Sequence, residues 1–223
     1  MYDGSPMTPT RAQISSMLCS KKRVKELRTR LGSISWYMKS LNEFIARRAN
    51  VEDQCKGRFW EGRFKCIRLE DESAILSCAV YIDLNPIRAN AATSLDENKF
   101  TSIYERIRNH KPTKSPEPEL WLNPIQDTPT RKGFLSMSFM EYLAIVDATG
   151  GELRNGKKGR IPPHIEPILK RLGIRSNVWS KTSSNFGKMF SSVAGRTSSM
   201  VRAAQQAKRF WYKGIHASKL AFC

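Results

Sequence analysis

The sequence predicts an α+β protein built from a mixed first domain and a basic, mainly helical second domain. Residues 34–49 and 71–84 carry apolar side chains at the three- and four-residue spacing of an α-helix. Between them, residues 55–69 interleave aromatic and basic side chains around two glycines, which favours an extended segment. Beyond a proline-rich stretch, the chain resumes short helical patterns. Its length of 223 residues suits one large domain or two small ones.

Changes in composition set the domain boundaries. Residues 1–20 scatter Ser, Thr, Pro and Met without a period, so we expect a weakly ordered start. Residues 21–108 hold the helical and extended patterns of the first domain. Residues 109–133 contain five of the eleven prolines, which predicts a linker. Residues 134–223 form the basic helical extension.

The elements of the first domain have local causes. Residues 21–31 are strongly basic, with apolar residues at helical spacing. The clearest helix, 34–49, has one apolar stripe, formed by Ile34, Tyr37, Met38, Leu41, Phe44 and Ile45. Acidic residues open the helix at 71–84, where the helix dipole favours them. Pro86 disfavours a helical Asn85, so we expect this helix to end there.

The second domain is predicted as a series of short helices. Residues 138–148 form an amphipathic pattern that should end before Gly150 and Gly151. Further helices are predicted at 164–172, 177–194 and 197–213. Gly173 suits the position just past the first of these. No internal repeat is visible, and the spacing leaves open whether the helices include a helix-turn-helix.

The charge predicts a polyanionic partner. The chain has 38 Lys and Arg against 20 Asp and Glu, a net charge of +18. Residues 155–223 hold 14 basic residues and one acid, Glu166, a net charge of +13, whereas 51–154 have a net charge of −2. Nucleic acid is the first expectation and an anionic membrane the second. The alternative is a solvated basic surface without a partner.

Composition also excludes several classes of protein. No run reaches the roughly 18 apolar residues of a membrane span. The N-terminus lacks the apolar region of a secretory signal, so we expect a cytoplasmic protein. The five cysteines form no C-x-x-C pair, and the three histidines are isolated in sequence, so neither a zinc site nor a disulfide framework is predicted.

Several basic residues are candidates for phosphate contact. In 55–69 they alternate with Phe59, Trp60 and Phe64, whose rings offer stacking faces for bases. The alternative is an amphipathic strand with these aromatics in the core. The nucleic-acid-binding candidates are Arg47, Arg48, Arg58, Arg63, Lys65, Arg88, Lys208 and Arg209. For each of them, a plain surface role is the competing interpretation.

One segment, YIDLNPIRA at 81–89, combines a Tyr near a helix end with an amide four residues later. Read alone, it is better explained as a buried Tyr at a helix end followed by an Asn cap. Together with SWYMKSLNEFIARRAN at 35–50 and GRFWEGRFK at 57–65, it makes this chain resemble the REP-associated tyrosine transposases. These are bacterial proteins of the HUH single-tyrosine, insertion-sequence-200-like transposase family. The segments MEYLAIVDATGG and IPPHIEPILKRLGI, at 140–151 and 161–174, resemble the extension of its longer members.

The resemblance implies a ferredoxin-like catalytic fold that acts on single-stranded DNA at hairpin repeats, in the bacterial nucleoid. Tyr81 corresponds to the nucleophile, which forms a 5′-phosphotyrosine link and frees a 3′-hydroxyl. A phenol is mostly protonated at neutral pH and needs activation. In the family a divalent cation, Mg²⁺ or Mn²⁺, supplies it by polarising the phosphate. Its ligands are a His-hydrophobic-His pair and a polar side chain one turn past the Tyr, here Asn85. Relatives act as monomers or homodimers.

The sequence departs from the family pattern, since it contains no His before His110. We therefore expect an N-terminally truncated copy with a partial ferredoxin-like sheet. Without the His pair, no autonomous cleavage is expected unless a partner chain supplies the missing half. Two functions follow: a transposase that cleaves DNA through Tyr81, or a DNA-binding remnant without chemistry. A basic RNA-associated protein is a third option.

Overall fold

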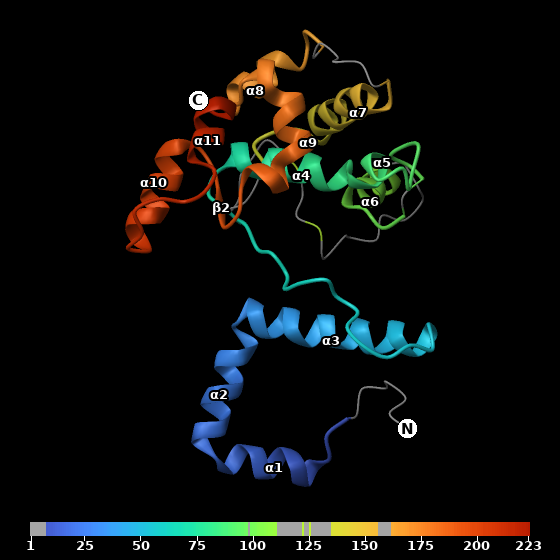
Figure 1. Ribbon diagram of the computed structural model, residues 1–223, viewed down its shortest axis with the longest axis vertical. Helices are drawn as coiled ribbons and strands as arrows, with labels where there is room; N and C mark the ends of the chain where they lie inside the picture. Colours follow the sequence, from blue (N-terminus) through green and yellow to red (C-terminus); the bar gives the residue numbers. More distant parts are fainter. Residues whose placement is uncertain (1–7, 98, 111–121, 123–124, 126–134, 156–161) are drawn as a thin grey trace. The chain divides into compact units, whose positions relative to one another are not determined.

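The computed structural model describes residues 8–97, 99–110, 122, 125, 135–155 and 162–223. It divides the chain into two compact units, Met1–Phe64 and Lys65–Cys223 (Figure 1). Most of the predicted linker at 109–133 lies outside the described residues.

The first unit contains three helices, α1 (Arg11–Cys19), α2 (Lys21–Leu31) and α3 (Ile34–Glu52). Helix α1 replaces part of the weakly ordered start predicted for 1–20. Its cause is a capping box: the Gln13 amide donates to the Thr10 hydroxyl, and the Thr10 amide donates to the Gln13 side chain at 2.8 Å. The predictions of helices at 21–31 and 34–49 are confirmed.

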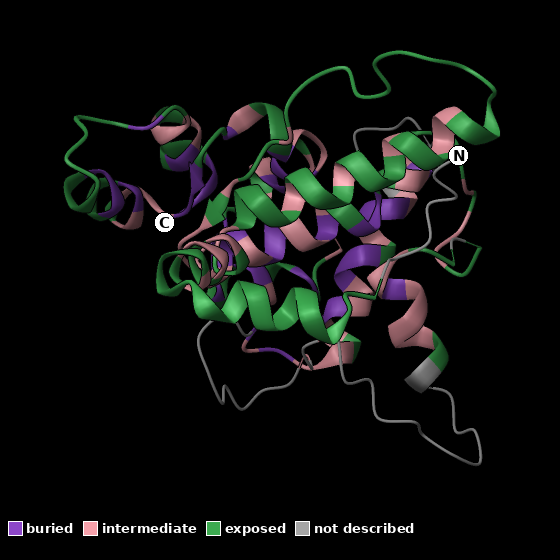
Figure 2. Ribbon diagram, turned by 90° about the horizontal axis from the view of Figure 1, so that it is seen from below, coloured by how far each residue is buried: buried purple, intermediate pink, exposed green. Residues whose placement is uncertain are grey.

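The first unit has no buried helix residue. All residues of α1, α2 and α3 are described, and none of them is buried (Figure 2). The apolar stripe of α3 is therefore open, with Phe44 50% and Tyr37 63% exposed. Periodicity predicted this stripe correctly, but it does not indicate what covers it.

The segment after α3 is irregular, although 55–69 were predicted as extended. The Trp60 indole donates to the Asn42 carbonyl at 2.8 Å, and the Asn50 amide donates to the Gly57 carbonyl at 3.0 Å. These side-chain bonds hold the segment against α3 without a strand ladder. Only Arg68–Leu69 forms a strand, β1.

The second unit is assembled around α4 (Glu72–Asp83), which confirms the helix predicted at 71–84. The Asp71 side chain caps its first turn by accepting from the Ala74 amide at 3.1 Å. Helix α4 contacts α5 (Asn85–Arg88), α7 (Phe139–Asn155) and α9 (Trp179–Met189). Its partners bury a common core that includes Leu76, Val80, Tyr142, Ile145, Trp179 and Phe186.

A short parallel sheet is the β component of the described chain. Strand β1 pairs with β2 (Val193–Ala194), and Arg68 lies opposite Val193. Next to this pair, the Arg196 amide donates to the Asp71 carboxylate at 2.6 Å, and its guanidinium donates to the Leu172 carbonyl at 2.9 Å. The class is thus α+β, with two short strands among the described residues. The ferredoxin-like sheet implied by the resemblance is not part of what they show.

The remaining helices are α6 (Ser102–His110), α8 (Glu166–Arg171), α10 (Thr197–Gln206) and α11 (Ile215–Ala221). Gly173 follows α8 at φ +67°, which confirms its predicted place. The helix predicted at 177–194 ends at Met189, and the one at 197–213 ends at Gln206, where Lys208 turns left-handed at φ +52°.

Helix α7 continues through Gly150 and Gly151, where an end was predicted. A Cβ on Gly150 would lie 3.1 Å from the Leu84 side chain, so this glycine allows α7 to approach Leu84 closely. Tertiary packing thus overrides the local helix-breaking tendency of glycine. None of the helices in the described part of the chain is both long and apolar enough to cross a membrane.

Candidate nucleic-acid interface

The structure packs Tyr81, Asn85 and Arg88 tightly against one another. Tyr81 lies in the last turns of α4, and Asn85 begins α5. The Arg88 guanidinium carbon lies 3.9 Å from the centre of the Tyr81 ring. On the α9 side, Phe186 meets the same ring at 6.3 Å between centroids. Tyr81 is therefore held between a cation and the core.

Arg88 holds three helices together. Its Nη1 donates to the Ser184 carbonyl of α9 at 2.8 Å, and Nη2 donates to the Tyr81 carbonyl and to the Asn85 side-chain oxygen. Burial lowers the pKa of this guanidinium, while the neighbouring Tyr81 opposes that change. An arginine remains charged in any case. Both terminal nitrogens of Arg88 are engaged inside the protein and its buried Nε has no hydrogen-bond partner, so a phosphate contact would compete with these bonds.

The hydroxyl of Tyr81, the expected nucleophile, lies close to α9, and the side-chain oxygen of Asn85, the expected metal ligand, accepts a hydrogen bond. A Cβ on Gly187 would lie 3.2 Å from the Tyr81 hydroxyl oxygen, so that oxygen rests on α9. The Asn85 oxygen, the expected metal ligand, accepts from Arg88 at 3.2 Å. Within the described residues, no group of three or more His, Cys, Asp or Glu is placed to hold a metal ion. A hollow of about 470 Å³ borders the site, lined by Tyr81, Ile82, Asn85, Pro86, Phe100 and Thr101.

Sequence reasoning missed a buried polar centre beside this site. Asp83, 2% exposed, accepts from the Tyr142 hydroxyl at 2.6 Å and from the Ser102 hydroxyl at 2.8 Å. Burial raises the pKa of the Asp83 carboxyl, and the hydrogen bonds from Tyr142 and Ser102 oppose the rise. Burial and the Asp83 charge raise the pKa of Tyr142 well above its usual value. One signal was present: an acid at a helix C-terminus opposes the dipole.

The first unit carries basic residues whose environments differ. Arg47 and Arg48 pair with Glu43 and Glu52 along α3, so their charge is locally balanced. The Arg58 Nε donates to the Trp60 carbonyl at 2.8 Å, while Arg63 is exposed. Lys65, which starts the second unit, is exposed as well. These residues remain candidates, with α3 the least favourable location for a phosphate.

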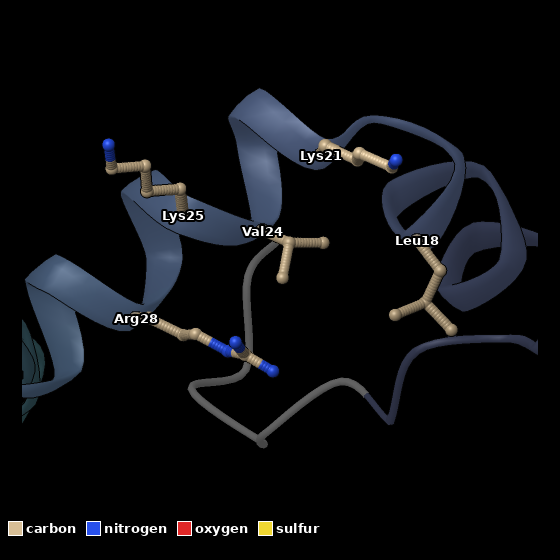
Figure 3. A pocket seen from close by; sticks show the side chains of 5 residues that line it. All are labelled: Leu18, Lys21, Val24, Lys25 and Arg28. Carbon is tan, nitrogen blue, oxygen red and sulfur yellow. The ribbon is translucent and has the colours of Figure 1, made fainter.

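Two further cationic features of the first unit were not predicted. Trp36 has the Arg30 guanidinium 4.2 Å and the Lys39 ammonium 4.7 Å from its ring centre. A hollow of about 460 Å³ lies between α1 and α2, lined by Leu18, Lys21, Val24, Lys25 and Arg28. Figure 3 shows Lys25 pointing away from the other side chains, so the cations do not converge on one point.

The segment that carries α9, α10 and α11 in the second unit is strongly basic. Residues 167–223 contain no Asp or Glu, and all of them are described. Exposed cations here include both predicted residues, Lys208 and Arg209, and also Lys188, Arg202, Lys213 and Lys219. Glu166, the nearest acid in sequence, accepts from the Ser176 hydroxyl at 2.9 Å. The exposed cations of this segment attract anions, although the Asp71 carboxylate lies beside Arg196 at the start of α10.

No protein-family model, curated protein or solved structure matches this chain.

Proposed function

We propose that this chain binds single-stranded DNA through the basic surface of α9, α10 and α11, and does not cleave it. The observation that carries the proposal is the net charge of +13 over residues 155–223, gathered where no acid follows Glu166. A surface of this kind gains binding energy by releasing counterions from phosphates. We also propose that residues 21–108 belong to the tyrosine transposase lineage.

The packing of Tyr81 supports binding over chemistry. A nucleophilic phenol needs a base or a metal beside its oxygen. Here the oxygen rests on Gly187 of α9, and the Asn85 oxygen accepts from Arg88. Metal binding by Asn85 would have to compete with its hydrogen bond from Arg88. Binding through the C-terminal surface requires no such competition.

The second candidate is a transposase that cleaves DNA through Tyr81. The hollow next to Tyr81 and Asn85 favours it, because it gives the solvent side of this cluster room for a ligand. This function also needs Mg²⁺ or Mn²⁺ and the His-hydrophobic-His pair of the family pattern, which residues 1–109 do not contain.

A labelled DNA hairpin with a single-stranded 5′ tail separates the candidates. The full chain is incubated with it in Mg²⁺ or Mn²⁺, and binding is measured by fluorescence anisotropy. Covalent adducts are measured on a denaturing gel. We expect salt-sensitive binding without an adduct, equal in wild type and in Tyr81→Phe.

If wild type forms a covalent adduct and Tyr81→Phe does not, the chain is a transposase that cleaves DNA through Tyr81. Absence of binding at low salt would remove the binding proposal. Tighter binding to an RNA of equal length would favour the RNA-associated alternative.

A further inference from the structure

The loop between α10 and α11, residues 207–214, presents two aromatic rings to solvent. We call it the aromatic loop. Phe210 is 103% exposed and Trp211 is 66% exposed, whereas the next residue, Tyr212, is 9% exposed. Large aromatic side chains are usually among the best-buried groups of a protein. Two adjacent exposed rings therefore call for a ligand.

Both ends of the aromatic loop are fixed by the backbone. At the first end, Lys208 takes φ +52°, and the Arg209 amide donates to the Ala204 carbonyl at 2.9 Å. At the other end, Gly214 takes φ +110°, and a Cβ there would lie 2.9 Å from the Met189 carbonyl. Tyr212 is anchored in the core between them. The exposure of the two rings thus belongs to a defined turn.

The charges of the aromatic loop identify the kind of ligand. Lys208, Arg209 and Lys213 flank the rings, and all three are exposed. No acid lies anywhere in residues 167–223. A ligand that suits this loop must combine negative charge with flat apolar faces. Single-stranded nucleic acid has both, since its unpaired bases stack on aromatic side chains while its phosphates contact cations. Duplex DNA presents its phosphates but keeps its base faces stacked inside.

A membrane surface also attracts aromatic and basic residues, but the helices next to the loop do not favour it. A membrane-bound helix lays a continuous apolar face into the lipid. In α10 the residues Met200, Ala203 and Ala204 are buried in the core, and Ala221 of α11 is buried too. Outside these buried faces, the large apolar side chains that α10 and α11 expose are Val201 and Leu220, one on each helix, which do not make a continuous apolar face.

We propose that Phe210 and Trp211 form a stacking platform for unpaired bases of single-stranded DNA, with Lys208, Arg209 and Lys213 contacting its phosphates. The inference rests on the proposed function and adds to it the residues that contact the bases. A purely electrostatic surface would bind any polyanion of equal charge. With a stacking platform, the unpaired bases also contribute to the binding affinity.

The test compares a labelled oligothymidylate with an abasic oligonucleotide of the same length, so that phosphate number is constant. Phe210→Ala and Trp211→Ala are made in the full chain, with Tyr37→Ala as the matched exposed aromatic on α3. We expect each loop variant to weaken oligothymidylate binding about tenfold, in the range of one stacked base. Binding of the abasic strand should stay unchanged, and the Tyr37→Ala variant should behave as wild type.

The outcomes distinguish this inference from the proposed function. If wild type binds both strands equally and the loop variants change nothing, the stacking platform is refuted while DNA binding stands. If wild type binds neither strand at low salt, the proposed function itself fails. If the loop variants lose binding to phosphatidylglycerol vesicles but not to oligothymidylate, the rings serve a membrane and the inference is overturned.

Discussion

Asp83 is a carboxyl group buried between α4, α6 and α7, where donors from three residues support its charge. They are the hydroxyls of Tyr142 and Ser102 and the backbone amide of Ile103. Removing a charge from water costs more than a single hydrogen bond returns. Burial therefore dominates, and the pKa of Asp83 lies above its usual value.

This shift predicts a pH dependence of stability with a definite sign. A carboxyl whose pKa is raised by folding binds more protons in the folded than in the unfolded state. Its contribution to the free energy of unfolding is thus largest below the ordinary carboxyl pKa of about 4 and falls as pH rises through the raised pKa. Urea unfolding of wild type and Asp83→Asn from acid to neutral pH measures the effect. The stability advantage of wild type over the variant should shrink with rising pH, and a growing advantage would contradict the shift.

Arg88 allows a second test, because its role depends on the shape of the guanidinium. Its two terminal nitrogens reach carbonyls of α4 and α9 and the Asn85 side chain at once. A lysine keeps the charge but has a single nitrogen to make these bonds. We expect Arg88→Lys to lower the free energy of unfolding by about 2 kcal/mol or more, measured in urea. The exposed Arg202→Lys on α10 should leave it unchanged, and an equal loss in both variants would refute the structural role.

At the scale of single residues, the sequence indicated that Tyr81, Asn85 and Arg88 lie near one another, but not which distant groups they contact. The spacing within 81–89 was enough to group Tyr81, Asn85 and Arg88, since all three lie within eight positions. Besides the nearby Tyr81 carbonyl, Arg88 donates to the carbonyls of Ser183 and Ser184, 95 and 96 positions away. No local pattern reports a bond over that distance. The same is true of Asp83 and Tyr142, 59 positions apart.

Elements were predictable where periodicity was strong and less so at their ends. The stripes at 34–49 and 71–84 located α3 and α4, because a helix of three or more turns repeats its pattern several times. Strands β1 and β2 have two residues each, too few for a period to show. The passage of α7 through Gly150 and Gly151 depended on packing against Leu84, which only the folded chain reveals.

The turn into α11 depends on one glycine. Gly214 has φ +110°, a conformation that residues with a Cβ rarely adopt, and the missing atom would lie 2.7 Å from the Phe190 ring. We expect Gly214→Ala to reduce the free energy of unfolding by about 2 kcal/mol or more, from backbone strain and overpacking together.

Gly62 is the matched control, because a Cβ there meets nothing within 4 Å and its φ is not in the left-handed range. Gly62→Ala should leave the thermal midpoint close to that of wild type. A Gly214→Ala variant as stable as Gly62→Ala would show that the aromatic loop tolerates rearrangement at this end.

For the whole molecule, the charge was the most reliable sequence signal, and its placement was only partly visible. The excess of basic residues in 155–223, 14 against one acid, was evident from counting. The structure adds that exposed cations lie on α9, α10 and α11, and that two exposed aromatic rings share a loop with two of the predicted cations. The rings were missed because a helix was predicted through residue 213, whereas α10 ends at Gln206.

The charge predicts that DNA binding weakens with salt, and the contribution of individual cations to this dependence can be measured. For single-stranded DNA, the logarithm of the binding constant falls with the logarithm of salt by about 0.7 for each phosphate contact. Replacing Lys208, Arg209 and Lys213 by Ala should therefore reduce the slope by about 2. The control removes three exposed cations of α2: Lys21, Lys22 and Lys25. Titrations of oligothymidylate at several salt concentrations give both slopes, and an equal change in the two variants would show that net charge alone governs binding.

The pairing of β1 with β2 has a consequence for how the second unit is made. Strand β1, Arg68–Leu69, can pair only after Val193–Ala194 has been synthesised. The hydrogen bond from the Arg196 amide to Asp71 likewise needs a residue 125 positions later in the chain. During synthesis, which proceeds from the N-terminus at about 5–20 residues per second, α4 emerges many seconds before these partners. Contacts of such separation are slow to form because the loop between them must close first. A ribosome product that stops before Val193 would lack the partner of β1 as well as the aromatic loop, so early termination should yield protein that is poorly folded as well as unable to bind.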